Sequence, residues 1–184
     1  MSKLFISNNN KKTPLTIYFL SFICFILLST CNSYNLKVGG TPPDFVCKDI
    51  LGNTHKLSKY KGKVVLVHFW TDFCKSCKVE FPKIQQLYEE LKGKEFELLA
   101  INLGQKESIS KDFQREFGVT FPMLLDTKNE MQKMYDLTSF PTNFFIDPKG
   151  KIIRIIKGWV DKRQVEVIIR QSKGGKIKNV ATLH

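Results

Sequence analysis

The chain has 184 residues, of which 42% are hydrophobic and 25% charged, and 29 Lys and Arg residues against 17 Asp and Glu residues give a formal net charge of +12. This composition indicates one globular domain of ordinary size, and it excludes a disordered chain, a fibrous protein and a protein with many membrane-spanning helices. Five cysteines are too few for a small domain held together by disulfides, and their odd number leaves at least one thiol outside any intramolecular pair.

The N-terminal segment, residues 1–33, has the pattern of an export signal or membrane anchor. Its first 14 residues contain three lysines and no acidic residue, and the next 14 carry no charge. A permanent span needs about 20 apolar residues, so this run is better sized for export. Residues 28–31 resemble the bacterial lipobox, in which Cys31 would be lipidated; an uncleaved signal anchor and ordinary cleavage near Cys31 are the alternatives. All three outcomes place the remaining chain outside the cytoplasm.

The rest of the chain predicts one α/β domain over residues 44–172, between a Gly- and Pro-rich linker (34–43) and a basic C-terminal tail (173–184). In chain order we expect a hairpin at 44–53, a buried strand at 64–70, a helix at 75–92, a strand at 96–103, a helix at 108–117 that begins at a serine cap, a helix at 129–135, a hairpin of strands 143–147 and 151–157, and a helix at 161–171. Strands joined through helices run parallel, and the last hairpin adds an antiparallel edge, so the sheet is mixed and has helices on both faces.

Strict alternation along the last predicted strand places Ile152 and Ile156 on one face of the sheet and Ile153 and Ile155 on the other.

The chemistry is carried by Cys74 and Cys77, which form a C-x-x-C pair directly after the buried strand and at the start of a helix. The free N–H groups and the positive dipole end of the helix stabilise a thiolate at the first cysteine. Cys74 is therefore the predicted nucleophile, and Cys77, one turn further on, is the predicted resolving thiol.

Other interpretations of this pair are weaker. A zinc site needs a second pair of ligands, but Cys47, His55, His68 and His184 stand singly in the sequence. A purely structural disulfide across one helical turn closes almost no loop and constrains the unfolded chain little. We therefore expect a redox pair, no bound metal and no cofactor, with Cys47 as a small buried core residue.

Beyond these patterns, most of the predicted domain resembles the TlpA/ResA-like thiol:disulfide oxidoreductases, in the AhpC/TSA-redoxin branch of the thioredoxin superfamily. The matching segments are residues 43–45, 57–63, 70–77, 80–82, 118–126 and 135–147. The resemblance implies a thioredoxin-like fold with an N-terminal β-hairpin, a central strand-helix insertion between residues 103 and 126, and a bacterial, exported and usually membrane-tethered protein.

The resemblance also implies a client-binding site around the cysteine pair. By this resemblance, Pro141 would be a cis-proline facing the disulfide. A cis X–Pro bond suits this place because it turns the backbone tightly and proline offers no N–H of its own. The backbone of Phe140 would then pair with an extended client beside Cys74. Trp70 and Thr142 complete the predicted client-binding residues, with Trp70 also packing against the pair and shielding it.

Glu80 lies three residues after Cys77, so the two share a face of the helix. In cytochrome-maturation members of the family a glutamate at this position lies near the disulfide, where its carboxylate can tune thiol acidity or carry a proton. The alternative is an ordinary solvated helix glutamate. Pro82 is expected to kink this helix.

His68 and Lys75 depart from relatives. Plain thioredoxins have a buried Asp at the position of His68, and this family often has Asn there. We hypothesise that His68 takes or gives the proton of Cys77, because an imidazole titrates near neutrality; the alternative is a half-buried strand histidine with a hydrogen-bond partner. The charge of Lys75 should lower the pKa of Cys74.

The predicted activity is reduction of disulfides in a client protein, with the C-x-x-C of apocytochrome c as the client that the resemblance suggests. The oxidised pair would be re-reduced by a membrane electron donor of the CcdA/DsbD type. A peroxiredoxin-like peroxidase is an alternative, but Trp70 occupies the position of that family's proline. A copper-binding assembly factor would need a later histidine, and none lies between His68 and His184.

The excess of basic residues is concentrated from residue 148 onward, where the sequence contains ten Lys and Arg residues and only two acidic residues. We interpret it as a solvated face, with weak attraction to anionic lipid beside the anchor as the alternative. No nucleic-acid partner is expected of an exported redox domain.

Overall fold

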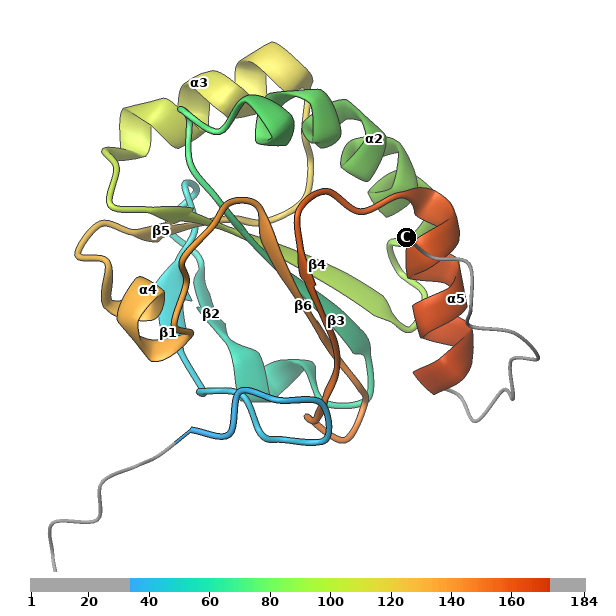
Figure 1. Ribbon diagram of the computed structural model, residues 1–184. Coiled ribbons are helices and arrows are strands. Elements are labelled where there is room, and N and C mark those ends of the chain that lie inside the picture. The colour runs from blue at the N-terminus through green and yellow to red at the C-terminus, as the bar shows by residue number, and fades with distance from the viewer. Residues whose placement is uncertain (1–33, 173–184) are drawn as a thin grey trace, which may run out of the picture. The chain divides into compact units, whose positions relative to one another are not determined.

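The computed structural model describes residues 34–172, so the predictions for residues 1–33, including Cys31, and for the tail at 173–184 lie outside the described part. The elements in chain order are β1 (Val46–Lys48), β2 (Thr54–Lys56), the 3-10 helix η1 (Leu57–Tyr60), β3 (Val64–Trp70), α2 (Lys75–Leu91), β4 (Phe96–Leu103), α3 (Glu107–Phe117), β5 (Met123–Asp126), α4 (Glu130–Met134), β6 (Thr142–Ile146), β7 (Ile152–Lys157) and α5 (Lys162–Ser172) (Figure 1).

A five-stranded mixed sheet forms the centre of the domain, in the order β5-β4-β3-β6-β7. Strand β3 runs parallel to β4 and antiparallel to β6, and β7 closes the edge as the antiparallel partner of β6. The separate hairpin β1–β2 is antiparallel. The predicted mixed α/β architecture is confirmed.

Strand β3 separates two hydrophobic clusters, because its side chains alternate between the two faces of the sheet. Val64, Leu66 and Trp70 pack with residues of α2, α3 and α5, whereas Val65, Val67 and Phe69 pack beneath β1, η1 and α4. Figure 1 shows α2 and α3 along one side of the sheet, with α4 and the β1–β2 hairpin on the other. Burial on both faces explains the continuous apolar run of this strand.

The predicted alternation of β7 is wrong. Ile152 and Ile155 share one cluster, while Ile153 and Ile156 pack against the other. The register between β6 and β7 shifts at Phe145, which pairs with Arg154, while the next residue of β6 pairs with Ile152. An extra residue at such a bulge reverses the alternation, and no local pattern announces it.

Two element starts also differ from the prediction. Helix α3 begins at Glu107, with Lys106 at its cap position and no side-chain cap bond, so the predicted serine cap is wrong. Strand β6 begins at Thr142, one residue earlier than predicted. Pro82 lies inside α2, which continues beyond it to Leu91.

Part of the segment predicted as a linker pairs with the edge of the sheet. The N–H of Gly39 donates to the carbonyl of Ile152 at 2.7 Å, and the N–H of Ile152 donates to the carbonyl of Gly40 at 2.9 Å. A Cβ at Gly40 would lie 1.9 Å from the carbonyl oxygen of Asn35, so only glycine fits there. The two hydrogen bonds to Ile152 hold residues 39 and 40 on β7.

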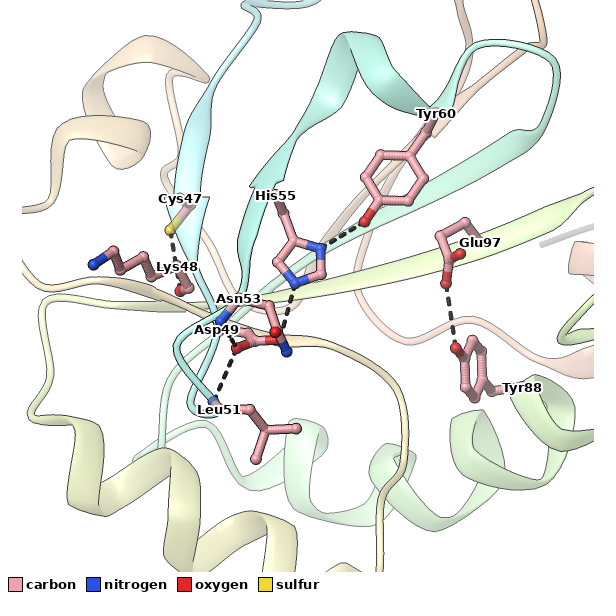
Figure 2. A network of polar contacts seen from close by, with 9 residues as sticks. All are labelled: Cys47, Lys48, Asp49, Leu51, Asn53, His55, Tyr60, Tyr88 and Glu97. Atoms are coloured by element: carbon pink, nitrogen blue, oxygen red, sulfur yellow. Dashed lines mark hydrogen bonds and ion pairs between the residues drawn. The ribbon is translucent and has the colours of Figure 1, made fainter.

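A polar cluster ties the β1–β2 hairpin to η1 (Figure 2). Asp49 accepts hydrogen bonds from the backbone N–H groups of Leu51 and Asn53 and lies 2.9 Å from His55 Nε2. His55 Nδ1 lies 2.5 Å from the hydroxyl of Tyr60. Burial opposes ionisation of Asp49, but the bonds from His55 and Asn53 outweigh it and lower the pKa of the carboxyl.

Cys47 has the environment of a core residue. It is buried as a free thiol, and its Sγ lies 3.1 Å from the carbonyl oxygen of Leu125. Burial raises the pKa of the thiol to about 11, so it stays protonated and unreactive at neutral pH. The structure supports the prediction of a buried, inert Cys47.

Within residues 34–172, no helix has both the length and the apolar character that a membrane span requires.

Candidate active site

Cys74 and Cys77 form a disulfide at the N-terminus of α2, where β3 has just ended. Cys74 occupies the cap position, and the backbone N–H of Cys77 points at its Sγ at 3.2 Å. The Cα atoms of the two cysteines are 5.3 Å apart. A first-turn N–H aimed at this sulfur stabilises a thiolate there when the pair is reduced.

The two cysteines differ in access to solvent. Cys74 is 8% exposed, whereas Cys77 has no exposed surface. Of the two, only Cys74 therefore offers any surface to a client. The hydroxyl of Ser76 lies 3.7 Å from the Cys74 sulfur, and this contact was not predicted.

The loop that leads into the pair is held by Asn102 of β4 and by Gln105, two residues after that strand. Gln105 accepts from the backbone N–H of Asp72 at 3.0 Å, donates to the Asp72 carboxylate, and accepts from the amide of Asn102 at 2.7 Å. The two bonds between Asp72 and Gln105 connect residues 33 positions apart. No motif in the sequence singled out Gln105 or Asn102.

The peptide bond between Phe140 and Pro141 is cis, the conformation that the family resemblance implies. Thr142, the next residue, pairs with Phe69 of β3, so Pro141 lies alongside Trp70 at the same end of the sheet as the disulfide. The Thr142 side chain is buried and donates to the carbonyl of Ser139 at 2.6 Å. Its hydroxyl thus shapes the proline loop rather than facing a client.

Trp70 has no exposed surface. Its ring packs against Phe81 and Phe113, with centroid separations of 4.9 and 4.4 Å. Trp70 therefore has the predicted packing role, but it has no exposed surface with which to contact a client. Phe73, directly before Cys74, is 73% exposed and is an aromatic side chain that a client can contact there.

Glu80 is buried beside the pair, so the solvated alternative is wrong. One carboxylate oxygen accepts from the backbone N–H of Val160 at 2.8 Å, and the other has no hydrogen-bond partner among the described residues. Burial raises the pKa of Glu80 to about 7, although the Val160 N–H and the charge of Lys83 act in the opposite direction. Glu80 can thus be either neutral or ionised near pH 7.

His68 is fully buried on the α2 side of β3, with its ring 5.8 Å from that of Phe81. Nδ1 lies 2.8 Å from Asn143 Oδ1, and the Asn143 amide donates to the carbonyl of Gly158 at 2.7 Å. Because the amide orientation leaves Oδ1 as the acceptor, Nδ1 carries the proton and Nε2 holds a lone pair with no partner among the described residues. Burial lowers the pKa of His68 to about 4, so the ring is neutral at pH 7.

Residues 158–160 join these parts into one assembly. The N–H of Gly158 donates to the carbonyl of Pro141 at 2.8 Å, its carbonyl accepts from Asn143, and Val160 donates to Glu80. We call residues 158–160 the strap. Neither the strap nor Asn143 was predicted as part of the site, because their only signal is contact with residues far away in the sequence.

No group of three or more His, Cys, Asp or Glu side chains in residues 34–172 is arranged to hold a metal ion.

Comparisons with known proteins agree with this geometry. The AhpC/TSA family model matches residues 38–155. The thiol-disulfide oxidoreductase ResA of Geobacillus kaustophilus (strain HTA426) is 39% identical over 131 residues, which cover 71% of this chain and 75% of ResA.

Two solved structures have the same fold. A putative thiol:disulfide interchange protein DsbE from Chlorobium tepidum is 31% identical with a TM-score of 0.69, covering 75% of this chain and 99% of that one. StoA from Bacillus subtilis is 32% identical with a TM-score of 0.62, covering 69% and 96%. A thioredoxin-like domain, a family match over most of that domain and a disulfide at the start of a helix lead to one conclusion: the chain belongs to the AhpC/TSA family as a thiol-disulfide oxidoreductase of the ResA type.

Proposed function

We propose that this oxidoreductase works outside the cytoplasm as a reductase of disulfides in client proteins. The observation that carries the proposal is the unequal exposure of the two cysteines, 8% for Cys74 and 0% for Cys77, at the end of the sheet where the cis-proline lies. Such an arrangement suits attack by one thiol and release by the other.

In the reduced enzyme, the Cys74 thiolate attacks one sulfur of the client disulfide. The Cys74–client bond forms, the client S–S bond breaks, and the departing client thiolate takes a proton. Cys77 then loses its proton and attacks Cys74 Sγ, which forms the enzyme disulfide and releases the second client thiol. Two electrons pass to the client, and the enzyme ends in the oxidised state of the structure.

The proton of Cys77 needs an acceptor in a buried place. Glu80, with a pKa of about 7, is suited to take this proton in its ionised form and return it later. His68 stays neutral at pH 7, so its proposed part is to accept through the unpartnered Nε2 rather than to donate. We further propose that the charge of Lys75 favours the Cys74 thiolate.

Client binding is proposed to use the backbone of Phe140 beside Pro141, with the client added as an extended strand. The C-x-x-C of apocytochrome c, reduced before haem attachment, is the client we propose from the ResA-type sequence. A membrane protein of the CcdA/DsbD type would return electrons to the pair.

For the segments outside the described residues, we propose that residues 1–33 direct export and attach the protein to the membrane, with Cys31 as a lipidation site, and that residues 173–184 form a basic tail. The charge pattern of the first 28 residues supports this proposal.

Trapping tests the proposed direction of the reaction. Cys77→Ser should accumulate a mixed disulfide between Cys74 and its client, because nothing then releases it, and the double variant with Cys74→Ser should trap nothing. Mass spectrometry of the trapped species identifies the client. The proposal is contradicted if the wild-type enzyme, supplied with Cys74 and Cys77 reduced, reduces neither a client disulfide nor a model disulfide.

A further inference from the structure

Three of the most exposed large apolar side chains of the described residues belong to the start of α2, to the loop just before it and to the strap held against this helix. Phe73 is 73% exposed, Val79 is 64% exposed and Trp159 is 54% exposed. Phe73 precedes Cys74 directly, Val79 lies one turn into α2, and Trp159 is the middle residue of the strap. Exposed apolar surface of this kind, gathered at one place, indicates contact with another molecule.

The exposure of Trp159 is built into the fold. The residues on both sides of it are held: Gly158 by Pro141 and Asn143, and Val160 by the Glu80 carboxylate. The same three anchors belong to the active site described above. Trp159 is therefore presented to solvent by a fixed strap between the proline loop and α2.

The start of α2 carries positive charge beside these apolar groups. Residues 73–83 contain three exposed lysines, Lys75, Lys78 and Lys83, and no exposed carboxylate, because Glu80 is buried. Lys78 lies over the ring of Phe113 in α3, so Lys75 and Lys83 are the lysines considered below. The ammonium group of Lys83 lies 5.2 Å from the centre of the Trp159 ring. In the structure of residues 34–172 none of the three lysines takes part in an ion pair.

From these observations we infer that Trp159, Val79 and the lysines of α2 form a docking surface for a segment of the client protein. This segment is an extended peptide that has an aromatic or aliphatic side chain and at least one carboxylate beside its disulfide cysteine. The apolar side chain rests on Trp159 and Val79, and the carboxylate faces Lys83 or Lys75. This inference rests on the proposed function and adds a specificity to it: opposite charges favour encounter and like charges disfavour it.

The test compares two synthetic peptides on the same enzyme. Both carry one intramolecular disulfide and one phenylalanine, and they differ only in Glu or Lys residues beside the attacked cysteine. The complete chain, solubilised in detergent and reduced beforehand, is mixed with each peptide, and the second-order rate constant of the single turnover is measured. We expect the acidic peptide to react about fivefold faster at low ionic strength, and the ratio to approach one in about 1 M salt.

Lys83→Glu should bring the ratio to one or reverse it, and the ratio cancels any change in thiol reactivity caused through Glu80. Lys149→Glu, an exposed charge reversal in the β6–β7 turn, is the matched control and should leave the ratio unchanged. In Trp159→Ala the rate with each peptide, divided by the rate of the same variant with bis(2-hydroxyethyl) disulfide, should fall about fivefold, since that small molecule cannot reach the strap and the active site together.

The outcomes separate the two proposals. Equal rates for both peptides, or a faster basic peptide, overturn the docking inference while leaving the reductase intact. If the enzyme reduces none of the three disulfides, neither the two peptides nor bis(2-hydroxyethyl) disulfide, the proposed function itself is overturned. Vesicles with anionic lipid that slow both peptides equally, without any preference between them, would assign this surface to the membrane and also overturn the inference.

Discussion

The domain contains two histidine clusters that differ in how completely their polar atoms are satisfied. In the hairpin cluster both ring nitrogens of His55 have partners, the Asp49 carboxylate on one side and the Tyr60 hydroxyl on the other (Figure 2). Beneath the disulfide, His68 has one partner, Asn143, and its Nε2 has none among the described residues. A free oxygen of Glu80 adds a second unsatisfied atom there.

We interpret the hairpin cluster as structural and propose that the cluster under the disulfide is the reactive one. Buried polar atoms without partners lower stability, and His68 Nε2 and a Glu80 oxygen are two of the six such side-chain atoms among the described residues. The hairpin cluster uses its bonds to fasten β1, β2 and η1. The cluster under the disulfide keeps two groups whose pKa values are shifted in opposite senses, because burial favours the neutral form of both an acid and a base.

The largest expected effect concerns the pH dependence of stability of the oxidised domain. Glu80, with a pKa raised to about 7, binds more protons folded than unfolded, so its contribution to stability falls as pH rises from about 4.5 to 7. His68, with a pKa lowered to about 4, binds fewer protons folded, so its contribution rises with pH from about 4 to 6.5. In the wild type the two slopes oppose each other.

Single variants should reveal each slope. Glu80→Gln leaves a free energy of unfolding that rises between pH 4 and 6.5, and His68→Asn leaves one that falls between pH 4.5 and 7, each by about 3 kcal/mol at most. Urea denaturation at several pH values measures both, with the double variant as control. Parallel slopes in the two single variants would contradict the assigned protonation states.

A smaller effect is expected in the hairpin cluster. Asp49→Ala removes the acceptor of two backbone N–H groups and of His55, and should lower the free energy of unfolding by about 2 kcal/mol. The rate of disulfide reduction should stay within about twofold, because no residue of the candidate active site takes part in this cluster. A large loss of activity at unchanged stability would show that the two clusters are coupled.

The smallest effect should come from Tyr60→Phe, which removes one hydrogen bond from His55 and keeps the ring. We expect a loss of about 1 kcal/mol in the free energy of unfolding. The loss should nearly vanish in an Asp49→Ala background, since His55 is then no longer held from its other side. Fully additive losses would argue that the three side chains do not act as one cluster.

Local sequence patterns predicted those features that depend on nearby residues. The apolar run of β3 and the helical spacing of α2 identified the elements that carry the cysteine pair, and their order indicated a mixed sheet. The bulge in β7 was missed because it depends on how two strands pair. The prediction of a serine cap for α3 was wrong, because serine is common outside cap positions and the helix begins one residue earlier than predicted.

The sequence alone determined the redox pair, since two cysteines three positions apart on the first turn of a helix lie close together in any fold that keeps the helix. Tertiary structure decided the environment of that pair. Glu80 meets Val160 across 80 positions, and His68 meets Asn143 across 75. Neither the burial that shifts their pKa values nor the strap that presents Trp159 exists until those distant segments pack together, so no local pattern could specify them.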